Sequence, residues 1–390
     1  MIARAPYLFL LLIIIPDLYL DLHYWRHRYG GGWSPKRLLY WLPTIGMVAY
    51  TLYLMYEKNF MPDNSTILYI YLFLLGFIII PKWIYMICSI IGLGFCRLFR
   101  SKKNYGNLIG LLLVPLIWFV LFYGSTIGFQ KLEVNHQTYA SPDLPAAFDG
   151  YRIVLFSDAH VGSYKGRQHI LQNAIDHINA QHPDLMVYTG DLQNIQPQDI
   201  YEHMDILSSL KAKDGIYSVL GNHDYAMYID ADEARKVANN REIVSLEKQL
   251  GWTLLRNEHR ILTKGKDHIV IAGMENDGDG KKFPQLGNIN KTLKGVKEND
   301  FILLLEHDPS AWRRKIIPDG RAQLTLSGHT HKMQFSLFNW CPMTVTGKEV
   351  TDWYTEGTQS LFVTAGIGGL IPFRFGATGE IVVLTLKKSN

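Results

Sequence analysis

Five short motifs bring together side chains of the kinds that bind divalent metals. They are Asp158-Ala159-His160, Gly190-Asp191, Gly221-Asn222-His223-Asp224, His307-Asp308-Pro309 and Gly328-His329-Thr330-His331. Carboxylate, imidazole and amide oxygen together suit Mn, Fe or Zn better than Ca, which prefers oxygen ligands alone. The chain has three cysteines and no C-x-x-C spacing, so a thiolate-bound structural zinc is not expected. The motifs therefore predict a site for divalent metal ions.

A pair of metal ions would fit these residues and would cleave phosphoesters. Two ions about 3.5 to 4 Å apart need a ligand that reaches both, and we expect the two oxygens of Asp191 to bridge them. Such a site makes hydroxide available near neutral pH and holds phosphoryl oxygens. The leaving oxygen then needs a proton, which an imidazole can supply. His223, held by Asp224, is the candidate for that role.

The spacing of apolar residues predicts how these motifs are positioned. Short apolar runs at 152–156, 184–188 and 216–219 predict strands, and each is followed by one motif. Between them, 166–180 and 197–211 show helical spacing. Further strands are predicted at 131–140, 269–272, 301–305, 323–326, 360–364 and 381–386. The pattern favours an α/β domain of two packed sheets with helices outside, whose metal ligands lie at the carboxyl ends of strands.

In this order the motifs resemble the calcineurin-like metallophosphoesterase family, specifically its membrane-attached bacterial branch. The resemblance extends from about Leu144 to Arg374-Phe375-Gly376. It implies a four-layer α/β/β/α sandwich and gives His223 the acid or charge-stabilising role. It implies that the first metal is bound by Asp158, His160 and His331, both metals by Asp191, and the second by Asn222, His307 and His329.

Other positions are candidates for supporting roles. The branch commonly has an acid where this chain has Asn194, and Gly-Gly where it has Lys332-Met333. Asp224, Lys332 and Arg374 are candidates for supporting or substrate-contacting residues. The alternatives are that Lys332 points into solvent and that Arg374 pairs with a local carboxylate. Residues 224–300 lack a clear chemical motif, and a lid or substrate-reading insertion is expected there.

The first third of the chain is intensely apolar and predicts a membrane domain. Four stretches, at about 5–22, 38–56, 66–96 and 107–129, reach or nearly reach the ~20 residues that a spanning helix needs. We expect domains at 1–129 (transmembrane), 130–147 (linker and first strand) and 148–390 (catalytic). The third stretch carries Lys82 in its middle and would invert the topology if its latter part spanned separately. Asp17 and Asp21 are expected at the membrane interface.

The charges of the loops predict the orientation. Positive charges concentrate in the loops after the first and third stretches, at Arg26, Arg28, Lys36, Arg37, Arg97, Arg100, Lys102 and Lys103. The loop between them has Lys58 against Glu57 and Asp63. Because Lys and Arg resist translocation, the two basic loops should be cytoplasmic and the catalytic domain extracytoplasmic. The chain is thus expected to be a multi-pass cell-membrane protein.

The combined prediction is a membrane-anchored phosphohydrolase with two divalent ions, acting through metal-activated hydroxide. The anchor suggests a membrane-near substrate such as a phospholipid or a lipid-linked phosphate. Two alternatives stay open: a cytoplasmic-facing pyrophosphatase of a nucleotide-linked lipid A precursor, and a non-catalytic metal-binding membrane module. The net charge of +4 is modest, so nucleic acid is not expected as a partner, and no protein partner can be inferred.

Overall fold

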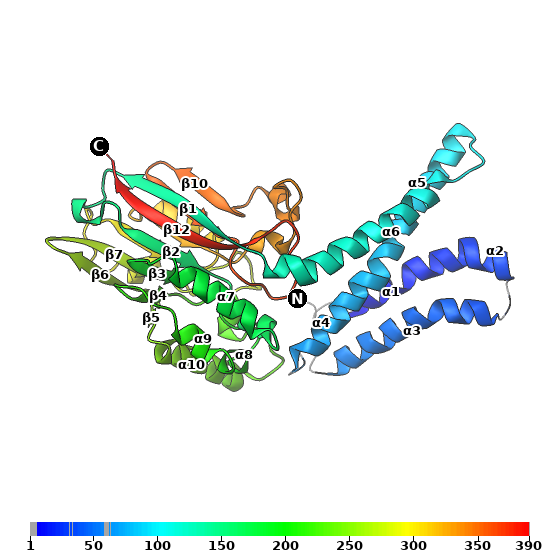
Figure 1. The fold of residues 1–390 in the computed structure, drawn as a ribbon, viewed down its shortest axis with the longest axis horizontal. Helices are drawn as coiled ribbons and strands as arrows, with labels where there is room; N and C mark the ends of the chain where they lie inside the picture. Colours follow the sequence, from blue (N-terminus) through cyan, green and yellow to red (C-terminus); the bar gives the residue numbers. More distant parts are fainter. Residues whose placement is uncertain (1–5, 31, 33, 58–61, 63, 390) are drawn as a thin grey trace. The chain divides into compact units, whose positions relative to one another are not determined.

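The chain folds into two compact units. The structure, a computed structural model, describes residues 6–30, 32, 34–57, 62 and 64–389. One unit extends to Ser125 and the other begins at Thr126. Figure 1 shows the chain coloured along its sequence. Lys58 and Asp63, used above for the orientation, lie outside the described residues.

The membrane unit is built from long apolar helices. They are α1 (Pro6–Leu20), α2 (Arg26–Tyr29), α3 (Pro35–Tyr56), α4 (Ser65–Leu74), α5 (Ile80–Phe99) and α6 (Tyr105–Tyr123), with π-helical turns at Asp21–Trp25, Leu75–Ile79 and Gly124–Gly128. In the described residues they form four helices long and apolar enough to cross a membrane: 7–29, 35–56, 65–99 and 105–128. The prediction of four spans is thus confirmed, and the third stretch is a single continuous helix.

Asp17 and Lys82 form an ion pair inside the membrane unit. Lys82 Nζ lies 2.7 Å from Asp17 Oδ2, and Asp17 is fully buried. Thr44 Oγ1 donates to the same carboxylate oxygen. Asp21, in contrast, pairs with Arg37 at 2.5 Å. Asp17 thus lies where three helices meet, and its position at the membrane interface stays a prediction.

The second unit contains two six-stranded sheets. The first has the order β1-β12-β2-β3-β4-β5 and the second β10-β11-β9-β8-β7-β6. The first sheet's strands are β1 (Leu132–Ser141), β2 (Arg152–Phe156), β3 (Leu185–Tyr188), β4 (Ile216–Ser218), β5 (Thr253–Leu254) and β12 (Gly379–Lys388). The second sheet's are β6 (Glu258–Lys264), β7 (Asp267–Gly273), β8 (Ile302–Leu305), β9 (Leu324–Ser327), β10 (Asp352–Glu356) and β11 (Gln359–Val363). In Figure 1, β1 and β12 lie side by side, and their ten-residue register is parallel.

Side chains alternate between the two faces of each buried strand, and this alternation creates the layers. On β2, Ile153 and Leu155 pack into the core between the sheets, while Val154 and Phe156 pack on the opposite face. The outer helices are α7 (Gln168–Asn179), α8 (Gln198–Tyr201), α9 (Met204–Ser208), α10 (Glu233–Gln249), α11 (Ile289–Thr292) and α12 (Ile317–Asp319). Helices α7, α9 and α10 supply side chains to the outer core of the first sheet, and residues of α11 and α12 pack against that of the second. The four-layer α/β/β/α sandwich is confirmed.

Two regions differ from their sequence predictions. The segment 197–211 is not one helix: it divides into α8 and α9, with Glu202 and His203 between them. The segment 224–300 was expected to hold a lid or a substrate-reading insertion, but most of it supplies α10 and strands β5, β6 and β7, which complete both sheets. Ile243 and Leu246 of α10 are buried in the outer core. This segment is part of the framework.

Glu247 is a buried acid on α10. It is fully buried, and Ser218 Oγ donates to its Oε2 at 2.5 Å. Burial, followed by repulsion from Asp224, raises the pKa of Glu247 to about 8 from an ordinary value of 4.5. The folded chain therefore keeps a proton on this side chain at pH values where the unfolded chain releases it.

We predict that this proton makes stability depend on pH. Stability should fall from about pH 4.5 to about pH 8, by up to about 1.4 kcal/mol per pH unit, because only the folded chain keeps the proton there. Glu247→Gln removes the titration. The Tm of this variant minus the Tm of the wild type should therefore be larger at pH 8.5 than at pH 5.5. The exposed Glu233→Gln on the same helix is the control. A wild-type-to-variant Tm difference that stays the same at both pH values would contradict the assignment.

Candidate metal centre

The sheets bring the five motifs to one edge of the sandwich. Strands β2, β3 and β4 are parallel neighbours, and so are β8 and β9. Each is followed directly by one motif, and the carboxyl ends of parallel strands meet at the same edge of a sheet. All seven sequence-predicted ligands are thereby gathered: Asp158, His160, Asp191, Asn222, His307, His329 and His331.

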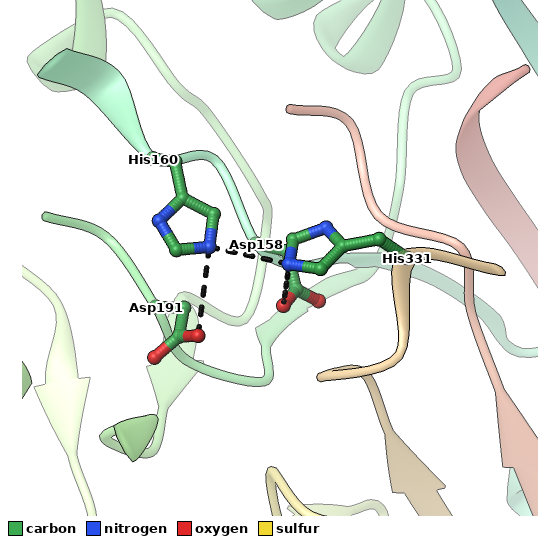
Figure 2. Close-up of side chains that lie close together, drawn as sticks. All are labelled: Asp158, His160, Asp191 and His331. Carbon is green, nitrogen blue, oxygen red and sulfur yellow. Dashed lines mark hydrogen bonds and ion pairs between the residues drawn. The ribbon is translucent and has the colours of Figure 1, made fainter. Parts of the chain in front are cut away.

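One cluster contains Asp158, His160, Asp191 and His331. Their ligand atoms all lie within 4.8 Å of one another. Figure 2 shows these four side chains pointing toward a common point, with His160 Nε2 and His331 Nε2 3.3 Å apart. His331 Nε2 lies 3.3 Å from Asp158 Oδ1, and His160 Nε2 lies 3.5 Å from Asp191 Oδ2. This donor set matches the first metal of the sequence prediction.

A second cluster shares Asp191 with the first. His307 Nε2 lies 3.2 Å from Asp191 Oδ2, and His329 Nδ1 lies 3.2 Å from His307 Nε2. Asn222 Oδ1 is 3.1 Å from His307 Nε2. The same oxygen of Asp191 thus faces His160 and His307, while Oδ1 accepts from the His223 backbone amide at 2.8 Å. Asp191 therefore belongs to both clusters, and its role as the bridge between two ions stays a prediction.

The chemistry of these donors fits divalent cations. Burial lowers the pKa of both His160 and His331 to about 3, so both imidazoles are neutral and keep a lone pair for coordination. Burial alone would lower the pKa of His307, but Asp191 raises it to about 10. The carboxylate of Asp191 thus favours a positive charge on His307. Carboxylates and neutral imidazoles converging at this distance favour a shared cation.

The backbone is strained at most of these residues. Asp158, His160, Asp191, His329 and His331 have φ values of 54°, 43°, 61°, 73° and 50°. Side chains other than glycine rarely adopt this left-handed conformation, which costs energy and is found mainly where function requires it. The strained positions coincide with the ligand positions, which supports a functional centre at this edge.

The glycines of the motifs let the ligand loops approach one another. A Cβ at position 221 would collide with Asp191 Oδ1, and one at position 328 would collide with Asp158 Oδ2. Glycine is the residue that allows such close approach of a backbone to a functional group. The glycines of G-N-H-D and G-H-T-H are therefore part of the geometry of the site.

The expectation that Asp224 holds His223 was wrong. The Asp224 carboxylate accepts from the backbone amides of Asp191, Leu192, Gln193 and Gly221. Burial, followed by repulsion from Asp191, raises the pKa of Asp224 to about 7. Asp224 therefore fixes the loops that carry the ligands, as a supporting residue, and its carboxylate is directed at backbone amides instead of at the His223 ring.

His223 is oriented by a backbone carbonyl. Its Nδ1 lies 2.6 Å from the carbonyl oxygen of Asn194, and its ring lies 4.8 Å from the His160 ring and 4.6 Å from the Tyr228 ring. Donation from Nδ1 leaves Nε2 as the atom able to exchange a proton. Sequence reasoning missed Tyr228, whose hydroxyl accepts from Asn222 Nδ2 at 2.8 Å, because no motif marks it.

Arg374 and Lys332 are placed differently. Arg374 is 1% exposed, and its guanidinium donates to the carbonyl oxygens of Gly368, Ala377, Thr378, Ala365 and Gly366. Arg374 thereby organises the loop in which the Gly368 amide donates to the Asp158 carbonyl oxygen. The Arg374 side chain is thus bound to backbone carbonyls, and it is neither free to contact substrate nor paired with a carboxylate. Lys332 is half-buried, with a φ of 50°, directly after His331.

Comparison with known families places both units in one group of proteins. The family described as calcineurin-like phosphoesterase matches residues 151–333. A second family, described as a probable calcineurin-like phosphoesterase transmembrane domain, matches residues 2–129. The matches cover the strands that carry the metal motifs and the apolar helices.

Curated relatives show the same similarity. An uncharacterized metallophosphoesterase of Bacillus subtilis, YkuE, is 34% identical over 69% of this chain and 90% of its own length. A transmembrane protein with a metallophosphoesterase domain from Danio rerio is 30% identical over 68% of this chain and 60% of its own length. The UDP-2,3-diacylglucosamine pyrophosphatase LpxG of Chlamydia trachomatis is 24% identical over 74% of this chain and 98% of its own length.

Proposed function

Because this chain belongs to the calcineurin-like metallophosphoesterases and is a metal-dependent phosphoester hydrolase, we propose that it uses two divalent ions to cleave a lipid-linked phosphoester. The observation that carries the two-ion assignment is the position of Asp191 Oδ2 between two clusters of ligands. Two bound ions would polarise the phosphoryl oxygens and lower the pKa of water. Manganese, iron and zinc all suit the donor set.

Different residues of the chain would then bind the two ions and act on the leaving group. Asp158, His160 and His331 hold one ion, Asn222, His307 and His329 the other, and Asp191 contacts both. His223, fixed through Nδ1, uses Nε2 to donate a proton to the leaving oxygen or to stabilise its charge. A sensor that only binds metal has no use for such a group beside a complete ligand set.

We predict separate effects for Asp191 and His223. In the full-length chain, Asp191→Ala should lose bound metal and Mn-dependent hydrolysis of chromogenic phosphomonoesters and phosphodiesters. His223→Ala should keep its metal but lose about 10²- to 10⁴-fold in kcat, which is the usual contribution of acid catalysis. Metal content by mass spectrometry and initial rates check both. The control is His177→Ala, on the exposed face of α7. A metal-loaded wild type that cleaves no ester would favour the non-catalytic module.

A lipid substrate is supported by an exposed apolar segment next to the metal centre. Residues 333–345, here called the apolar loop, begin two residues after His331. Within it Leu337 and Trp340 pair as an antiparallel bridge, and Phe338 and Asn339 form the tip with φ values of 50° and 64°. The tip presents Phe338 at 97% exposure. Such apolar exposure is unfavourable in water but suits the surface of a bilayer.

We predict that the apolar loop matters for lipid substrates alone. The double variant Phe338→Ser with Trp340→Ser should lose about tenfold or more of its rate on a lipid phosphate in vesicles, because burying each apolar side chain in the interface contributes to binding. Its rate on a soluble chromogenic ester should be unchanged. Ile261→Ser, 61% exposed on β6, is the matched control. Equal losses on both substrates would show a structural defect instead of a lipid contact.

The relative LpxG favours a second candidate reaction. That protein is named as a pyrophosphatase of UDP-2,3-diacylglucosamine, a nucleotide-linked lipid. A pyrophosphate bond joins two phosphoryl groups, and the same pair of ions could hold it. This reaction needs a catalytic domain that faces the cytoplasm, where nucleotides are made. The side of the membrane therefore separates the two candidate substrates.

We propose that the catalytic domain is extracytoplasmic, because four spans and two basic loops orient it so. A reporter enzyme that is active only outside the cytoplasm, fused after residue 390, should be active. A fluorescent reporter that matures only in the cytoplasm should stay dark at the same position. The reverse pattern would exclude this orientation and support the nucleotide-linked substrate.

A further inference from the structure

A cavity of about 800 Å³ lies among the helices of the membrane unit. Its lining is mainly aromatic and aliphatic and comes from α1, α2, α3, α5, α6 and the turns at Asp21–Trp25 and Leu75–Ile79. Arg28 and Tyr29 line it near the basic loop that follows the first span, and Phe77 and Trp118 line it deeper in the helices. Both its size and its apolar lining are typical of ligand pockets, which measure about 300 to 1,000 Å³.

Contacts between lining residues fix the aromatic walls of the cavity. The Trp25 ring stacks on the Tyr40 ring at 5.0 Å, and the Phe77 ring stacks on the Trp118 ring at 5.0 Å. Trp118 Nε1 also donates to the Phe77 carbonyl oxygen at 3.0 Å. A wall held in this way loses little conformational entropy when a ligand binds, which favours binding.

The charges on the lining are positive. Arg28 and Lys82 are the charged residues that line the cavity. Lys82 is balanced from behind by Asp17, at 2.7 Å, and covers the Tyr40 ring at 5.6 Å. Arg28 has no ion pair with any residue that the structure describes, and its guanidinium lies 6.0 Å from the Tyr29 ring centre. The cavity therefore offers, at the end nearest the basic loop, the exposed guanidinium of Arg28, which has no ion-pair partner among the described residues.

The depth of the cavity matches one leaflet of a bilayer. Along the first helix its lining runs from Leu20 to Tyr29, which is about 14 Å at the helical rise of 1.5 Å per residue. The hydrocarbon core of a bilayer is about 30 Å thick, so one leaflet contributes about 15 Å. A lipid whose head group lies at Arg28 would place its acyl chain along Tyr24, Tyr85 and Phe77.

We propose that this cavity binds a lipid with an anionic phosphate head group, drawn from the leaflet on the side of the basic loops. Arg28 contacts the phosphate, and the aromatic walls enclose an acyl chain. Basic pockets between membrane helices recognise anionic head groups in this way. The lipid bound here stabilises the membrane unit, and its binding does not depend on the metal centre or on any reaction there.

Native mass spectrometry of the full-length chain in detergent tests the proposal, with phosphatidylglycerol and phosphatidylcholine as the probe lipids. The wild type should bind phosphatidylglycerol about tenfold more tightly than phosphatidylcholine, as expected from one charge-assisted contact. Arg28→Gln should bind the two lipids alike. Val114→Phe fills the deep part of the cavity and should weaken the binding of both, and Val114→Leu should do so to a smaller degree.

Two matched variants control for position and size. Arg100→Gln removes an exposed cation from the other basic loop, and Leu116→Phe enlarges a side chain that is 55% exposed on the same helix as Val114. Both should behave as the wild type. Equal binding of the two lipids by the wild type, or variants indistinguishable from these controls, would overturn the proposal. A dimer that excludes lipid would assign the cavity to a second copy of the chain.

Melting curves without added lipid separate a folding defect from lost binding. If Val114→Phe does not fold, the milder Val114→Leu still decides whether the cavity is the site. Because hydrolysis is not measured, failure of this proposal would leave the catalytic assignment untouched, and failure of the catalytic assignment would leave this proposal standing.

Discussion

The catalytic unit depends on one carboxylate oxygen. Asp191 Oδ2 faces His160 from the first sheet and His307 from the second, at 3.5 Å and 3.2 Å. The two imidazoles can meet the same atom only if the sheets keep their spacing and register. That spacing is set by the core between them, where Leu155 and Leu305 are fully buried. A change in this core would act on the centre without touching a ligand, because close-packed interiors transmit strain.

Placing a carboxylate there requires neighbours that compensate its burial. Asp191 is 1% exposed, and burial alone would raise its pKa, but attraction from His307 and the other imidazoles holds it well below its usual value. Asp224 restrains the backbone on both sides through four amides, and Arg374 restrains the neighbouring loop through carbonyl oxygens. The strain at the ligands is thus supported by polar groups that never need to contact substrate.

Much of this arrangement could be predicted from sequence, because it is encoded locally. Apolar runs followed by ligand motifs gave the central strands, and helical hydropathy gave four spans. Strands β6 and β10 were missed because each is an outermost strand of the second sheet with mostly half-buried or exposed positions, so neither shows an apolar run. The partner of His223 was missed for another reason. Adjacency in sequence suggested Asp224, but the tight turn aims that carboxylate at backbone amides and leaves the ring to Asn194.

Charge compensation also distinguishes framework from binding surface in the membrane unit. Asp17 and Lys82 are costly in an apolar medium, and each offsets part of the cost of the other, so the pair joins residues of three helices without implying a ligand. Buried Arg374 in the catalytic unit is balanced in the same manner by carbonyl oxygens. Arg28 differs because its charge has no counter-charge among the described residues while it borders an apolar cavity. An exposed cation without an ion-pair partner, beside an open apolar cavity, is the arrangement that an anionic amphiphile completes, since it supplies both missing partners at once.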